Sequence, residues 1–290
     1  MLKEQREIHA LVSLIEDPDI EILNNIKQKI MGYGEDAVFH LEKAWMNPAT
    51  NKPTQLRIEE IVHEIQFNIL LKNAENWVHE GADDLLSGMV LIAQYNYPDI
   101  SINNIRKYLD KIKQDIWIEL SPNLTAFEKI EVFNKVFFDM YGFKGNRKNY
   151  HSPNNSFINN VLESKKGSPL SLSIIYLIVA NELELPLEGV NLPNHFVLGY
   201  IDENLSRAVG NDSSDLVFYV NPFSRGALLM NDEVEKFLTE LELPLKDEFI
   251  LPCTTKDIVI RNLNNLIHAY SNLKETSRVD ELKQLIKILT

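Results

Sequence analysis

The sequence predicts an α+β fold that is predominantly helical, with a central buried helix, a small antiparallel sheet and helical extensions at both ends. Apolar residues recur at helical spacing through most of residues 11–140 and again through residues 254–289. Between these regions lies a segment that is apolar nearly all round, followed by two short runs typical of strands. The helical extensions are therefore expected to pack around a mixed core.

Bulk composition excludes several classes of protein. The 290 residues suggest about two domains, or one domain with extensions, and 44% hydrophobic with 24% charged residues is typical of a globular chain. A net charge of -13 repels phosphate backbones and anionic lipid, so neither nucleic acid nor membrane is expected as a partner. The single cysteine, Cys253, and a charged N-terminus without a signal sequence predict a cytoplasmic protein.

Residues 1–120 are predicted to form a helical N-terminal region. Helical spacing is interrupted at Asp17-Pro18-Asp19 and at Gly32-Tyr33-Gly34, both typical of turns. Two helices around the first turn predict a HEAT-like helix pair at residues 5–46. Further helices are indicated by two apolar stripes, one at Ile58, Ile61, Val62, Ile65 and Ile69, the other at Ile102, Ile105, Leu109, Ile112 and Ile116. The three tryptophans of this region, Trp45, Trp77 and Trp117, are expected to anchor the core.

Residues 121–235 are predicted to form the core domain and residues 236–290 a C-terminal helical pair. Ser168 is a plausible N-cap, and Pro169 suits the first position of the apolar helix. The strand-like runs cover residues 195–201 and 216–220, so His195 begins one strand and Asn221 follows the other. The expected antiparallel register sets these two residues opposite each other.

Three positions in this core suggest a catalytic arrangement. A cysteine at a helix start, a histidine on a strand and an acid or amide on the next strand form a thiol triad. The start of the apolar helix, His195 and Asn221 occupy those three places.

Residues 141–230 contain a succession of short motifs, namely the loop "Y…NNS…VLE", the helix start "G-x-P-x-SL", "LPLEGV", "P-x-HF" and the closing "PF…G". In this succession the segment resembles the SirB1 family of bacterial transglutaminase-like proteins, and the resemblance implies a papain-related fold. The resemblance implies a central helix packed on a small antiparallel sheet. It does not by itself imply an activity, because fold and function separate.

The resemblance also implies that the triad is degenerate. Aligned on Pro186, the cysteine position of active relatives falls on Pro169, which has no nucleophilic group. His195 matches the family histidine, whereas Asn221 stands where relatives usually have aspartate, and Asn194 where they often have glycine. We therefore assign no catalytic residue at these positions.

Other residues of the chain offer only weak evidence for a replacement nucleophile or a metal site. Ser171 is the possible replacement nucleophile, whereas Cys253 lies outside the motif. The Glu60-x-x-His63 pair has the spacing of a di-iron motif but occurs once, and it is interpreted as part of a solvated helix face. The histidines His9, His40, His79, His151 and His268 look scattered and form no metal-ligating motif. No metal, nucleotide or other cofactor is therefore expected.

Two functions remain open from the sequence. The first is a non-catalytic, transglutaminase-like pseudoenzyme that binds a protein or peptide partner or acts as a regulatory module. The second is a hydrolase or acyl transferase that uses His195 as general base with an unconventional nucleophile. An open cleft at His195 would favour ligand binding or chemistry, and a filled one would favour a structural histidine.

Overall fold

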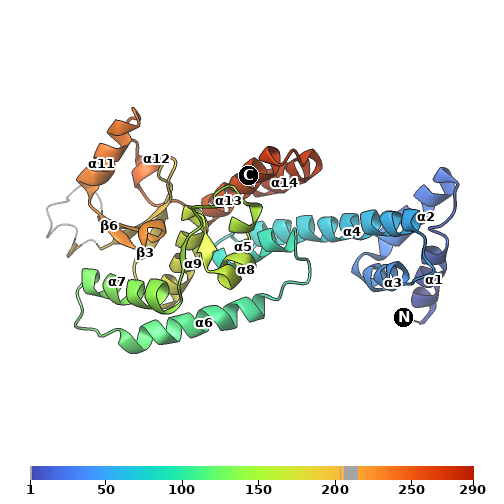
Figure 1. The fold of residues 1–290 in the computed structure, drawn as a ribbon, viewed down its shortest axis with the longest axis horizontal. Helices are drawn as coiled ribbons and strands as arrows, with labels where there is room; N and C mark the ends of the chain where they lie inside the picture. Colours follow the sequence, from blue (N-terminus) through green and yellow to red (C-terminus); the bar gives the residue numbers. More distant parts are fainter. Residues whose placement is uncertain (1, 203, 206–214) are drawn as a thin grey trace. The chain divides into compact units, whose positions relative to one another are not determined.

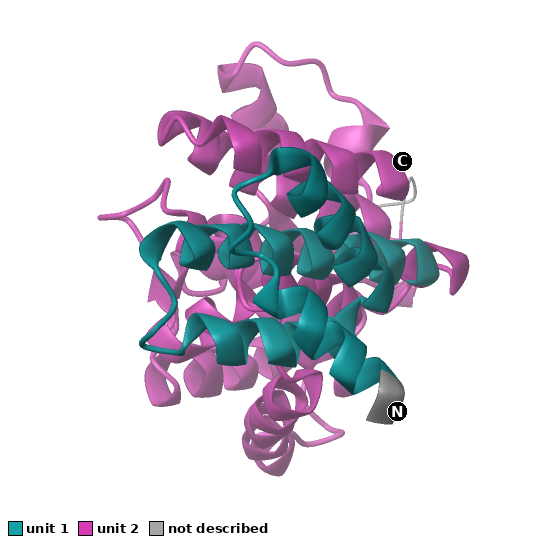
Figure 2. Cartoon of the chain, turned by 90° about the vertical axis from the view of Figure 1, so that its right-hand side faces the viewer, with its two compact units in different colours: residues 1–76 teal, residues 77–290 magenta. Residues whose placement is uncertain are grey.

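The computed structural model describes residues 2–202, 204–205 and 215–290. Its chain divides into two compact units, Met1–Asn76 and Trp77–Thr290, coloured teal and magenta in Figure 2. The sequence predicted three regions, a helical N-terminal region, a core domain and a C-terminal helical pair. That finer division stays a prediction, because the structure separates only the two units. None of the described helices combines the length and the apolar character that crossing a membrane requires.

The first unit is a small helical assembly. Its helices are α1 (Leu2–Ser13), α2 (Ile20–Tyr33), α3 (Glu35–Trp45) and α4 (Lys52–His79), the last of which continues into the second unit. Asp19 ends the predicted first turn and caps α2, because its side chain accepts hydrogen bonds from the backbone of Glu21 and Ile22. Gly34 joins α2 to α3 with a φ of 56°, a left-handed conformation that glycine adopts readily.

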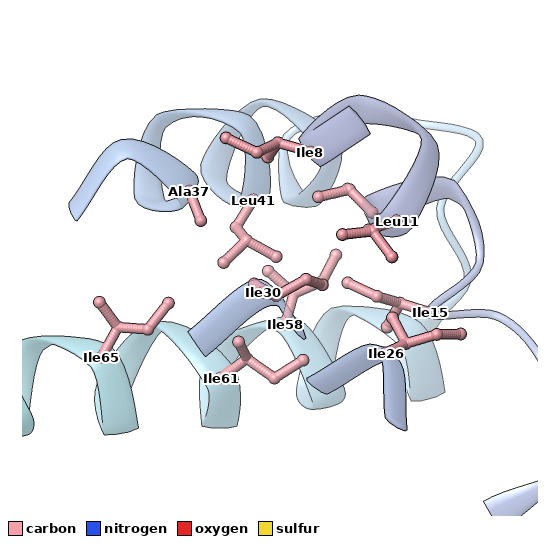
Figure 3. Packing of buried hydrophobic residues seen from close by; sticks show 11 residues of the cluster. Ile8, Leu11, Ile15, Ile26, Ile30, Ala37, Leu41, Ile58, Ile61 and Ile65 are labelled. Carbon is pink, nitrogen blue, oxygen red and sulfur yellow. The ribbon is translucent and has the colours of Figure 1, made fainter. Parts of the chain in front are cut away.

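Side chains from all four helices meet in the core of the first unit (Figure 3). Leu41 of α3, Ile30 of α2 and Ile15 after α1 are completely buried there, and Ile58 and Ile61 of α4 close the core from the other side. The apolar stripe predicted for residues 58–69 thus forms the face of α4 that packs in this unit.

The second unit contains the mixed part of the fold (Figure 1). Its helices are α5 (Leu85–Gln94), α6 (Ile102–Glu119), α7 (Ala126–Asn134), the π-helix η1 (Lys135–Met140), the 3-10 helix η2 (Pro153–Asn155), α8 (Ile158–Ser164), α9 (Pro169–Glu182), the 3-10 helix η3 (Pro222–Ser224), α11 (Asn231–Glu240), α12 (Asp247–Ile250), α13 (Thr255–Asn272) and α14 (Thr276–Leu289). Its strands are β1 (Lys144–Gly145), β2 (Lys166–Gly167), β3 (Leu187–Val190), β4 (Val197–Ile201), β5 (Leu216–Asn221) and β6 (Ala227–Leu229).

Helix α9 is the central helix that the sequence predicts. Every residue from Pro169 to Ala180 is buried, and the helix packs against α6, α8, β3, β4 and η3. The apolar character all round this segment therefore reflects neighbours on every side. Helices α13 and α14, coloured red in Figure 1, pack on each other, and α13 also packs on α5 and η2.

The main sheet is antiparallel, in the order β3-β4-β5-β6, while β1 and β2 form a separate parallel pair. The predicted fold class, α+β with a helical majority and a small antiparallel sheet, is confirmed. The predicted register is wrong by two residues: Phe218 pairs with Tyr200, where that register would place Leu198. His195 is not part of β4, because its backbone N–H closes a turn by donating to Leu192 at 3.0 Å.

The three tryptophans differ in burial, so the prediction that all of them anchor the core is wrong. Trp77 is buried, but Trp117 is 68% exposed and Trp45 is 39% exposed. The buried face of α6 is formed by Ile105, Leu109, Ile112 and Ile116. Trp117 follows Ile116 directly and so falls on a different face of the helix.

Candidate functional site

A cavity of about 360 Å³ opens in the second unit at the first turn of α9. Four segments that are distant in the sequence line it. These are residues 150–156 around η2, residues 168–170 at the start of α9, residues 194–196 before β4, and Arg261, Asn265, His268 and Ala269 of α13. Two of the three positions that were predicted to form a triad, Pro169 and His195, therefore line the same cavity.

The start of α9 is fixed by a capping box between two serines. Ser168 Oγ accepts from the backbone N–H of Ser171 at 3.1 Å, and Ser171 Oγ accepts from the backbone N–H of Ser168 at 2.9 Å. The predicted N-cap at Ser168 and first helical position at Pro169 are thereby confirmed. Ser171 is only 2% exposed and is not part of the cavity lining, so its hydroxyl belongs to the cap.

His195 sits on a tight turn between β3 and β4. Asn194 has a φ of 59°, a left-handed conformation that asparagine and glycine tolerate better than other residues. The His195 ring is half-buried and meets the Phe237 ring edge to face, with centroids 5.1 Å apart. Burial lowers the pKa of the His195 imidazole below its usual value, and the neighbouring positive charge of Arg261 lowers it further.

Arg261 holds this turn in place from α13. Its Nη2 donates to the backbone carbonyls of His195 at 2.7 Å and Leu192 at 3.2 Å, and its Nη1 donates to the side chain of Asn191. The guanidinium also lies 5.4 Å from the centroid of the Phe196 ring. Arg261 was not predicted, since nothing near it in the sequence indicates that it faces residues 191–196.

Asn221 lies outside the cavity lining. Its Oδ1 accepts hydrogen bonds from the backbone N–H groups of Phe223 at 3.1 Å and Ser224 at 3.3 Å, which makes it the cap of η3. Its backbone pairs with Ala227 in the sheet. The structure thus places this residue in a turn at the end of β5, and its assignment as a triad position stays a prediction.

His151 and His268 correct the interpretation that the remaining histidines are scattered. Their ring centroids lie 5.7 Å apart, and both rings line the cavity beside His195. Tyr150 packs edge to face on His151, with centroids 5.1 Å apart. Because His151 and His268 belong to a loop and to a helix far apart in the chain, only the tertiary contact between these elements brings them together.

Buried asparagines hold the loop that carries His151. Asn155 Nδ2 donates to the backbone carbonyls of Asn149 and Tyr150, both at 2.8 Å, and its Oδ1 accepts from Asn146 Nδ2 at 2.8 Å. Asn262 of α13 donates from Nδ2 to the carbonyl of Ser156 at 2.9 Å. The asparagine-rich loop is thus folded onto α13 by side chain to backbone bonds.

Cys253 is separate from the candidate site. It lies outside the cavity lining, and burial raises the pKa of its thiol to about 11, so the reactive thiolate is scarce near neutral pH. Within the described residues, no three side chains of the His, Cys, Asp and Glu types are arranged to hold a metal ion.

The sequence of this chain is similar to one family of known proteins. A profile of the transglutaminase-like superfamily matches residues 103–264, which include α9, the sheet and most of α13. A UPF0162 protein from Xylella fastidiosa is 30% identical over 224 residues, which cover 73% of this chain and 74% of that protein. The UPF0162 protein YchA from Escherichia coli is 30% identical over 114 residues, covering 39% of this chain and 42% of that protein.

The relatives include a much longer human protein. F-box only protein 21 from Homo sapiens is 29% identical over 202 residues, which cover 61% of this chain but 32% of that protein. No solved structure is significantly similar to this chain.

Proposed function

This chain belongs to the transglutaminase-like superfamily, and on that premise we propose that it is a non-catalytic member of SirB1 type that binds a segment of another protein. The segment would lie in the cavity between the start of α9, the turn at His195 and α13. The region that an active relative uses for chemistry would then serve recognition, in a regulatory module.

The observation that carries this proposal is the side chain at the first position of α9. Pro169 lines the cavity, and the family resemblance implies that active relatives carry a cysteine at this position, whereas proline offers no group that can attack a carbonyl. The nearby Ser171 hydroxyl is buried in the capping box, and the Cys253 thiol lies outside the cavity. Neither of these two groups is therefore placed to serve as a nucleophile for His195.

The cavity is nevertheless open rather than filled. Its volume of about 360 Å³ is in the range that ligand sites in proteins have. A second hollow of about 470 Å³ lies against the same turn and shares Arg261, and its lining includes Leu243, Phe249 and Ile260. A polar cavity and a more apolar hollow beside one turn suit an extended peptide that presents side chains to both.

The comparisons show that a similar region also occurs within a longer protein, as a module would. The matched region of F-box only protein 21 makes up about a third of that protein, so this type of domain also occurs as part of a longer chain.

Selection from a displayed library of random peptides, repeated on two variants of α13, tests the proposal. Asn265 is exposed and lines the cavity, so Asn265→Trp should fill the cavity and abolish binding of the selected peptides. Ser271 is also exposed on α13 but lines neither the cavity nor the second hollow, and Ser271→Trp is the matched control for loss by misfolding. Peptides that bind wild type and both variants equally would contradict the proposal.

A turnover screen tests the competing function, a hydrolase or acyl transferase with His195 as general base. Amide, ester and amine-transfer substrates would be offered to wild type and to His195→Ala at equal thermal stability. We expect no turnover by either protein. Turnover that disappears in His195→Ala would show that the site is catalytic and would overturn the proposal.

A further inference from the structure

The cavity differs in charge from the rest of the chain. The protein carries 42 acidic against 29 basic residues, for a net charge of -13. Yet no Asp or Glu is among the described residues that line the cavity, whereas Arg261, His151, His195 and His268 all line it. Each of these four side chains is a cation or can become one by taking up a proton.

Arg261 has no acidic partner within the described part of the chain. Its guanidinium donates to neutral acceptors only, which are the carbonyls of Leu192 and His195 and the side chain of Asn191. Burial lowers the pKa of the Arg261 side chain, which means that its positive charge is held where solvent stabilises it poorly. A half-buried cation without a counter-ion favours binding of an anion.

The cavity lining also includes neutral side chains that can donate hydrogen bonds to a bound ligand. Tyr150, Ser152 and Asn265 line it, and their side chains form no hydrogen bond with any described residue. The first turn of α9, a helix of 14 residues, points its N-terminal end at the same space and adds a partial positive charge. Cations, neutral donors and a helix terminus thus converge on one volume.

We propose that the cavity recognises a carboxylate of the bound peptide, either an acidic side chain or the C-terminal group. This inference rests on the proposed function and specifies the partner of the same site. The strongly negative surface disfavours approach of a polyanion such as nucleic acid. The fitting partner is therefore a neutral or basic segment that carries a carboxylate for the cavity.

Small model compounds test the carboxylate directly. N-acetylglutamate α-amide represents an acidic side chain, N-acetylglycine represents a C-terminal carboxylate, and N-acetylglutamine α-amide is the neutral control. The imidazole signals of His151, His195 and His268 would be followed by NMR as each compound is added. We expect at least one of the two carboxylates to shift these signals and to raise the pKa of His195, while the amide leaves them unchanged.

A charge variant supplies the matched control. Asn265→Asp places a carboxylate in the cavity lining without a change in size, and it should weaken carboxylate binding about tenfold by repulsion. Asn264→Asp adds the same charge one residue away, outside this cavity, and should weaken binding much less. Equal effects of the two variants would show that overall charge, not the cavity, governs binding, and would overturn the inference.

The remaining outcomes are also decisive. Equal shifts from the glutamate and glutamine compounds, shifts from inorganic phosphate only, or no shift from either carboxylate would each overturn the carboxylate inference. Each of these results would be compatible with selected peptides that bind wild type but not Asn265→Trp, so the proposed function would still stand. Loss of that dependence on Asn265, with carboxylate shifts intact, would instead contradict peptide binding and leave a small-anion site.

Discussion

Arg261 Nη2 donates a hydrogen bond of 2.7 Å to the backbone carbonyl of His195, and this bond ties α13 to the turn that carries the histidine. The same guanidinium lowers the pKa of the His195 ring, after the larger effect of burial. One residue of α13 therefore helps to hold the turn that carries the histidine and also contributes to the lowered pKa of its ring.

Replacing Arg261 should weaken the fold and alter His195 together. We expect Arg261→Gln to lower the free energy of unfolding by roughly 2–4 kcal/mol, because several charge-assisted hydrogen bonds are lost. The pKa of His195 should rise, since a neighbouring cation is removed while burial persists. Denaturant unfolding and NMR titration would measure these effects. Arg225→Gln, which removes an exposed ion pair with Asp139, is the control and should change stability by less than about 1 kcal/mol.

His195 should make stability depend on pH in a predictable direction. Its pKa is lowered in the folded state, so below the ordinary value of about 6.5 the unfolded chain takes up a proton that the folded chain resists. This contribution to stability is complete above that value, and it declines as the pH falls toward the folded pKa. Urea unfolding of wild type and His195→Gln at about pH 7.5 and about pH 5.5 would compare the two slopes. An equal loss of stability in both proteins would contradict the prediction.

Restoring a thiol at the first position of α9 should produce a reactive cysteine. We expect Pro169→Cys to be alkylated by iodoacetamide at least about tenfold faster than Cys253, because a helix start and a nearby imidazole favour the thiolate. Cys253, whose thiol has a pKa raised to about 11, is the internal control. Adding His195→Ala to Pro169→Cys should slow the reaction. An introduced thiol as inert as Cys253 would argue against Pro169 as a nucleophile position.

Alanine substitutions at two glycines would distinguish the cost of backbone strain from the cost of steric overlap. Gly226 has a φ of 73°, and a Cβ there would overlap the side chain of Asn134, which donates to the Gly226 carbonyl at 3.0 Å. Gly142 has a φ of 76°, but nothing lies within 4 Å of the Cβ position. Gly142→Ala should therefore cost about 1–2 kcal/mol for strain alone, and Gly226→Ala roughly 2–4 kcal/mol. Chemical denaturation would compare them, and equal losses would show that Asn134 moves aside freely.

Local patterns in the sequence predicted the parts of the fold that local physics determines. The N-cap at Ser168, the first helical position at Pro169 and the buried character of α9 all follow from short stretches of chain, and the structure confirms them. The strand register did not follow, because the turn at Asn194 keeps His195 out of β4. Strand pairing depends on that turn geometry, which the run of apolar residues does not indicate.

The candidate site was predictable only where neighbouring motifs form it. Pro169 and His195 were singled out from the sequence, and both line the cavity. Arg261, His151 and His268 were missed, because each comes from an element whose spacing shows only an amphipathic helix or a polar loop. Their convergence depends on how α13 packs on η2, which is a long-range contact.

The role of Asn221 as the cap of η3 has a consequence for how this chain can change by mutation. Aspartate caps a helix start about as well as asparagine does, so exchanging the amide for a carboxylate at this position should leave the turn intact. The stability of the fold therefore does not favour either asparagine or aspartate at this position. Whichever of them a related protein carries would reflect selection on activity, or drift once that selection is relaxed, rather than any demand of the turn.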